Sequence, residues 1–95
     1  MLDAESAWIE RFVRHLAYER RLSDLTCKHY RRDLSGLAKY CDEQSLPRWE
    51  SLNDDHIRAF AAQTYRRGLS SRSIQRQLSA ARTFFRYLLR ERHVK

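Results

Sequence analysis

The stretch that decides the fold is residues 70–92, SSRSIQRQLSAARTFFRYLLRER. Apolar side chains recur in it at steps of three and four residues, which is the period of an α-helix. Ser70 or Ser71 can cap this helix, because a serine hydroxyl accepts a hydrogen bond from an otherwise unpaired backbone N–H. We therefore expect a helix from this cap to about Arg92. On a wheel at about 100° per residue, its inner stripe consists of Ile74, Leu78, Ala81, Phe85, Leu88 and Leu89.

The same period continues through most of the chain and predicts three further helices. They run from about Ala4 to Arg21, from a Ser23 cap to about Asp42, and from an Asn53 cap to Gly68. The expected inward-facing residues are Trp8, Ile9, Phe12, Val13 and Leu16 in the first, Cys27, Tyr30, Leu34, Leu37, Ala38 and Cys41 in the second, and Ile57, Phe60, Ala61 and Thr64 in the third. No alternating run of β-branched residues predicts a strand. The expected fold is all-α, a compact bundle of four helices.

Composition limits the function. The chain has 95 residues, enough for one domain, with 19 Lys and Arg against 12 Asp and Glu, a net charge of +7. Such an excess favours a polyanionic partner. No apolar run is long enough to cross a membrane, and the acidic N-terminus does not resemble a secretory signal; we expect a cytoplasmic protein. Cys27 and Cys41 lie on one predicted helix about 21 Å apart, too far for a disulfide, and are expected in the core.

Positive charge concentrates on the second and fourth predicted helices. The side of the fourth helix opposite its apolar stripe carries Arg72, Arg76, Ser79, Thr83, Arg86 and Arg90. The short side chains between the arginines allow the helix backbone to approach a groove, and arginine pairs with phosphate or with guanine edges. The outer side of the second helix is a weaker version of the same pattern, with Lys28, His29, Arg32, Ser35, Gly36 and Lys39. A solvated face is the alternative explanation for either stripe alone, but two stripes of one sign favour a DNA-binding surface.

No combination of residues predicts catalysis. The four histidines lack the spacing of metal ligands, there is no glycine-rich phosphate loop, and none of the five tyrosines has an activating group nearby in the sequence. We therefore predict a binding module with no catalytic residue, no cofactor and no metal.

Two segments also resemble a known family. Residues 19–26 (ERRLSDLT) with residues 30–34 (YRRDL), and residues 67–88 (RGLSSRSIQRQLSAARTFFRYL), are similar to the second and fourth helices of Xer-type bacterial tyrosine recombinases. The resemblance implies that residues 1–95 are one SAM-like N-terminal core-binding domain, half of a clamp around DNA, with the catalytic domain outside this chain. The implied partners are double-stranded DNA with a dif-type recombination site and a second recombinase of the family in a heterotetramer that resolves chromosome dimers. The implied location is cytoplasmic and nucleoid-associated.

The resemblance and the wheel together select ten candidate DNA-binding residues. The family's DNA-facing positions match Thr26, Lys28, His29, Arg32, Arg72, Ser73, Arg76 and Gln77, and the wheel adds Ser79 and Thr83. The wheel places Gln77 beside the core. Two alternatives remain open: a dimeric helix-turn-helix regulator with its turn at residues 66–70, and a SAM-type protein-interaction module that docks through the acidic residues 42–55. For the isolated domain we expect a monomer.

Overall fold

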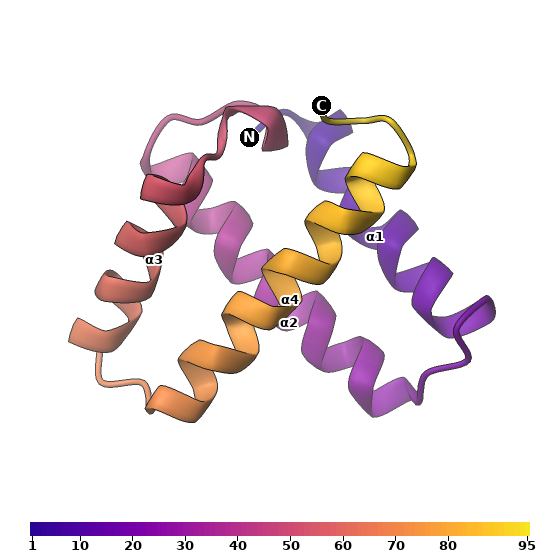
Figure 1. Cartoon of the computed structure of the whole chain (residues 1–95), viewed down its shortest axis with the longest axis horizontal. Coiled ribbons are helices and arrows are strands. Elements are labelled where there is room, and N and C mark those ends of the chain that lie inside the picture. Colours follow the sequence, from indigo (N-terminus) through magenta and orange to yellow (C-terminus); the bar gives the residue numbers. More distant parts are fainter.

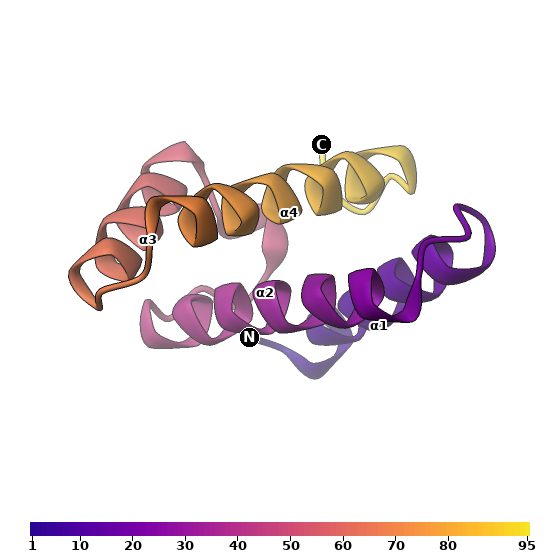
Figure 2. The same ribbon diagram turned by 90° about the horizontal axis from the view of Figure 1, so that it is seen from below.

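The computed structural model describes all 95 residues and contains four α-helices, one short 3-10 helix and no strand. The elements are α1 (Asp3–Tyr18), α2 (Asp24–Glu43), the 3-10 helix η1 (Trp49–Ser51), α3 (Asp54–Arg66) and α4 (Ser71–Arg90). Figure 1 shows α4 crossing in front of α2, with both chain termini at the same edge. Figure 2 shows two layers, α1 with α2 and α3 with α4. The all-α prediction is confirmed. None of the helices combines the length and apolar character needed to cross a membrane.

The predicted helix starts are confirmed at three sites. The Ser23 hydroxyl accepts a hydrogen bond from the Thr26 N–H at 3.2 Å, and the Ser70 hydroxyl accepts one from the Ser73 N–H at 3.2 Å. Asn53 accepts from the His56 N–H, while the His56 ring nitrogen accepts from the Asn53 N–H, both at 3.0 Å. These caps are local, so the sequence alone can place them.

Each of the four helices is followed, two or three residues after its end, by a residue with left-handed backbone geometry. These are Arg21 (φ 53°), Ser45 (φ 57°), Gly68 (φ 90°) and Arg92 (φ 59°). The next residue in each case donates its N–H back into the helix, as Leu22 does to the Leu16 carbonyl at 3.0 Å. The glycine ending was predicted, but the other three were not, because only glycine adopts this geometry without a steric penalty. As a result α1 ends at Tyr18 and α4 at Arg90, short of the predicted Arg21 and Arg92.

We predict that Ser45→Gly stabilises the domain. A left-handed non-glycine residue destabilises the folded chain by about 1–2 kcal/mol, and glycine removes this strain. Glycine also makes the unfolded chain more flexible, which offsets about 0.5–1 kcal/mol of the stabilisation. A thermal melt should show a transition a few degrees higher. Ser35→Gly is the matched control: Ser35 is an exposed interior residue of α2, where glycine lowers stability. Equal effects of the two substitutions would contradict the explanation.

The core is built around aromatic side chains. Phe12 of α1 lies 5.3 Å from Phe84 of α4, and Trp49 of η1 lies 4.9 Å from Phe84, all ring centroid distances. All three side chains are fully buried. Trp49 was not predicted as a core residue, because the segment between α2 and α3 shows no periodic pattern. The cysteines are buried and unpaired, as predicted; burial raises the pKa of the Cys41 thiol to about 11.

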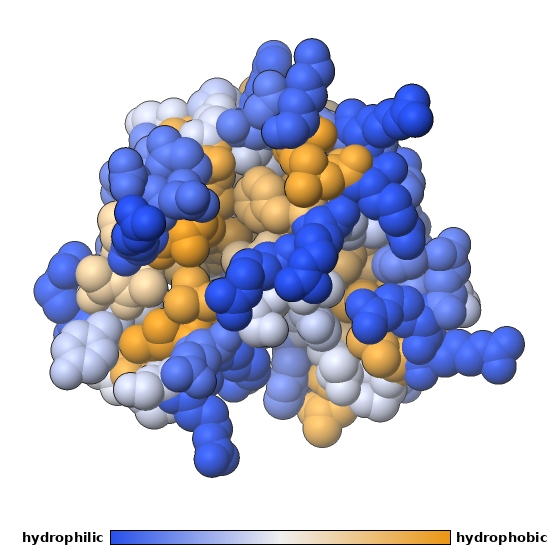
Figure 3. Space-filling model, viewed as in Figure 1, coloured by the Kyte–Doolittle hydropathy of each residue, from blue (hydrophilic) through white to orange (hydrophobic).

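The inner face of α4 is rotated relative to the prediction. Its buried residues are Ala80, Ala81, Phe84 and Leu88, whereas Ile74, Leu78 and Phe85 are half-buried and Leu89 is 51% exposed. The buried side of α4 is set by its packing against three other helices, α2, α3 and α1. A groove of about 440 Å³ remains between α3 and α4, lined in part by Ile57, Leu78 and Phe85, and Figure 3 shows apolar surface there. The expected burial of Trp8 is only partial; it stacks on His93 at 4.3 Å.

Candidate nucleic-acid interface

The site lies where α2 and α4 cross. A pocket of about 220 Å³, which we call the crossing cleft, separates the two helices at this point. Its lining residues are Thr26, His29, Tyr30, Asp33, Arg76, Ser79 and Ala80. Four of the ten candidate residues, two from each helix, therefore meet in one place: Thr26 and His29 from α2 and Arg76 and Ser79 from α4.

Arg76 is fixed in the cleft by an acidic residue of α2. Its Nε donates to Asp33 Oδ2 at 3.0 Å, and its Nη2 donates to Asp33 Oδ1 at 3.1 Å. The Asp33 side chain is 3% exposed and that of Arg76 is 40% exposed. Because the carboxylate occupies the Nε edge, the outer edge with Nη1 is free to donate to a ligand. Sequence reasoning missed Asp33, since nothing local distinguishes a buried acid from a solvated one.

The first turns of α2 and α4 carry matching hydroxyl pairs. The Ser23 hydroxyl donates to Thr26 Oγ1 at 2.9 Å, and the Ser70 hydroxyl donates to Ser73 Oγ at 3.1 Å. Figure 1 shows that both first turns lie along the lower edge of the molecule. Helix N-termini carry a partial positive charge. The N-termini of α2 and α4 therefore contribute positive charge at this edge, in addition to that of the arginine side chains. Thr26 and Ser73 belong to the caps as well as to the candidate set.

The structure does not bring the remaining six candidates into the cleft. Lys28, Arg32 and Arg72 are exposed and form no ion pair, and they do not line the cleft. Thr83 follows Ser79 along α4 and donates its hydroxyl to the Ser79 carbonyl at 3.0 Å. Gln77 is half-buried, in line with its predicted position beside the core. DNA contact by these ten residues stays a prediction.

A comparison with protein families identifies the class of this four-helix domain. Residues 9–92 match the family described as the phage integrase N-terminal SAM-like domain. The chain belongs to this family.

Curated proteins that are similar to the chain include tyrosine recombinases named XerC. The chain is 43% identical to the XerC of Pseudomonas syringae pv. tomato over 83 residues, and 42% identical to that of Azotobacter vinelandii over 83 residues; each alignment covers 87% of this chain and 28% of the relative. It is 34% identical to the XerC of Escherichia coli O157:H7 over 87 residues, covering 92% of this chain and 29% of the relative. The chain thus spans less than a third of the length of these relatives. No solved structure matched it.

These relatives also bear on the branch of the family. Within the Xer-type recombinases, residues 69–73 (LSSRS) and 88–91 (LLRE) predict a nearer relationship to XerC than to XerD. The similarity to XerC proteins confirms the assignment.

Proposed function

We propose that residues 1–95 form a single N-terminal domain that binds double-stranded DNA for a XerC-like site-specific recombinase. The observation that carries the proposal is the meeting of Thr26, His29, Arg76 and Ser79 at the crossing of α2 and α4. The ligand would be a dif-type recombination site. In the whole protein, a XerD-like recombinase would complete a heterotetramer that cuts and rejoins DNA to resolve chromosome dimers in the cytoplasm, at the nucleoid. The chemistry of cleavage would reside outside these residues.

The charges on α2 and α4 support a duplex as the ligand. The one acid that lines the crossing cleft, Asp33, is already neutralised by Arg76 at 3.0 Å. Lys28, Arg32 and Arg72 form no ion pairs and are free to neutralise phosphates. Phosphate contacts from such side chains set the position of a protein on DNA, and the free edge of Arg76 suits the O6 and N7 acceptors of guanine.

The two alternatives gain no support. The family match and the relatives are those of an integrase domain, and neither comparison points to a helix-turn-helix regulator or to a SAM-type protein-interaction module.

The proposal predicts a steep dependence of DNA affinity on salt. If five or six basic side chains neutralise phosphates, log affinity should fall with log salt at a slope of about −5. Fluorescence anisotropy of a labelled dif-type duplex, titrated between about 50 and 200 mM salt, measures this slope. Lys28→Ala and Arg72→Ala should each make it shallower by about 1.

The control for these variants is Arg58→Ala. Arg58 carries the same charge but lies on α3, where it pairs with Asp55 at 3.1 Å. It should leave the slope unchanged. A wild-type affinity that does not respond to salt would rule out phosphate binding by this surface.

A further inference from the structure

A second pocket lies along α4 beyond the crossing cleft, where α4 passes the end of α1. It has a volume of about 300 Å³, and we call it the Arg20 pocket. Its lining residues are Phe12, His15, Arg20, Thr83, Arg86, Tyr87 and Arg90. Three arginines converge in it, two from α4 and Arg20 from the segment that follows α1, and no acidic residue lines it.

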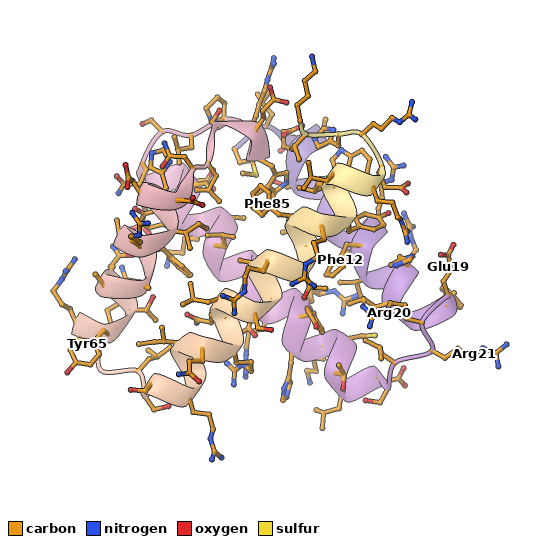
Figure 4. The ribbon with its side chains drawn as sticks, in the orientation of Figure 1. Phe12, Glu19, Arg20, Arg21, Tyr65 and Phe85 are labelled. Atoms are coloured by element: carbon orange, nitrogen blue, oxygen red, sulfur yellow. The ribbon has the colours of Figure 1, made fainter.

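Arg20 reaches the pocket because of the way α1 ends. The N–H groups of Glu19 and Arg20 both donate to the His15 carbonyl, at 3.0 and 3.2 Å, and Arg21 then takes the left-handed geometry that turns the chain toward α2. Figure 4 shows Arg20 pointing back toward α4, whereas Glu19 and Arg21 extend outward. The two consecutive arginines thus face different surroundings, which the sequence does not reveal.

The positive charges in the pocket are only partly compensated. Arg20 and Arg86 form no ion pair. Arg90 lies 3.6 Å from Glu91 and 3.4 Å from His15, and His15 lies 2.9 Å from Glu19. Both of these acids line the neighbouring pocket on the α1 side, together with Arg11 and Arg14. Like charges that converge without a counter-ion repel each other, so the Arg20 pocket is arranged to receive an anion.

The pocket continues the surface proposed for DNA. Thr83 lines it, and the Thr83 hydroxyl is bonded to the carbonyl of Ser79, which lines the crossing cleft. From Arg76 to Arg86, α4 advances about 15 Å, which corresponds to four or five base-pair steps of duplex DNA. One duplex can therefore reach both pockets. Guanidinium groups suit phosphate because two of their N–H groups match two phosphate oxygens.

We propose that Arg20 and Arg86 bind a backbone phosphate of the same duplex that occupies the crossing cleft. This inference rests on the proposed function. It extends the DNA-binding surface from α2 and α4 onto the end of α1, whose basic residues look uninformative in the sequence because acids lie among them.

The test compares two neighbouring arginines that carry the same charge. Arg20→Ala and Arg86→Ala should each make the salt slope of duplex binding shallower by about 1, so that the affinity lost between about 50 and 200 mM salt shrinks three- to fourfold. The loss should be the same for duplexes of different sequence, because a phosphate contact carries no base information. Arg21→Ala is the control, and its slope should stay near that of the wild type. A thermal melt of each variant verifies that the domain remains folded.

The outcomes separate this inference from the proposed function. If the wild-type chain binds a duplex with a steep slope but Arg20→Ala behaves as Arg21→Ala does, the Arg20 pocket does not bind phosphate and the proposed function stands. If the wild-type chain binds no duplex, both are wrong. An Arg20→Lys variant that retains the wild-type slope while Arg20→Ala does not would support a charge contact at this position.

Discussion

Trp49→Ala is expected to unfold the domain or to lower its melting temperature by more than about 10 °C. Truncation of a buried aromatic residue costs about 3–5 kcal/mol, against a total stability of about 5–15 kcal/mol for a small domain. Each kcal/mol corresponds to about 4–8 °C in a chain of this length. Trp49 is fully buried, and its ring meets Phe84 at 4.9 Å and Phe85 at 6.2 Å, edge to face.

The loss should exceed that of an ordinary core residue because the indole of Trp49 makes a buried hydrogen bond that alanine cannot make, in addition to the one made by the backbone N–H. Its backbone N–H donates to Glu5 Oε1 at 2.9 Å, and its indole N–H donates to the Glu5 carbonyl at 2.7 Å. The other carboxylate oxygen of Glu5 lies 2.8 Å from His93 Nε2. Trp49 and Glu5 thus join the segment between α2 and α3, the start of α1 and the C-terminal residues.

Far-UV circular dichroism during heating measures the effect. Tyr65→Ala is the control, because Tyr65 is an aromatic residue of α3 that is 68% exposed, and its loss should change stability by no more than about 0.5 kcal/mol. Trp49→Phe should fall between the two, since it keeps much of the packing but leaves the Glu5 carbonyl without the indole donor, at about 1–3 kcal/mol. A melting temperature of Trp49→Ala within a few degrees of the wild type would show that the segment between α2 and α3 contributes little to the fold.

The burial of Trp49 could not be predicted from the sequence, whereas the helices could. The helices and the caps at Ser23, Asn53 and Ser70 were predictable, because periodicity and capping depend on residues a few positions apart. The burial of Trp49 depends instead on Glu5, 44 residues away in the sequence. The rotation of α4 likewise depends on which helices it meets, which its own wheel does not contain.

In the candidate site, too, local features were predictable from the sequence and contacts between distant residues were not. Thr26, His29, Arg76 and Ser79 were predicted individually, and the structure brings them together because the polar sides of α2 and α4 face each other at the crossing. Asp33 and Arg20 were missed, because an acid that pairs across helices and an arginine that folds back past a helix end have no local signature. Asp33 matters to the site because it fixes the orientation of Arg76. Arg20 matters because it brings a further positive charge next to α4.

Arg76→Ala is expected to have two separate effects. If Arg76 contacts a base edge, specific DNA affinity should fall by about 1–3 kcal/mol, or about 5- to 150-fold. The folded domain should also lose stability, because the carboxylate of Asp33, 3% exposed, loses its cation. The cost for a fully buried pair is about 3–5 kcal/mol, and it should be smaller here, about 1–3 kcal/mol, because Arg76 is 40% exposed and water reaches the site.

A double variant separates these effects. Asp33→Ala with Arg76→Ala removes both partners, which is close to neutral compared with removing one, so thermal melts should show most of the lost stability restored. Specific affinity for a dif-type duplex, measured by anisotropy, should stay as low as in Arg76→Ala, since no guanidinium remains to reach the base. Recovery of affinity in the double variant would mean that Arg76 serves to neutralise Asp33 and does not touch DNA. The double variant has the same net charge as the wild type. A loss of DNA affinity that persists in it therefore cannot come from the overall electrostatic field, and it would show that Arg76 contacts DNA directly.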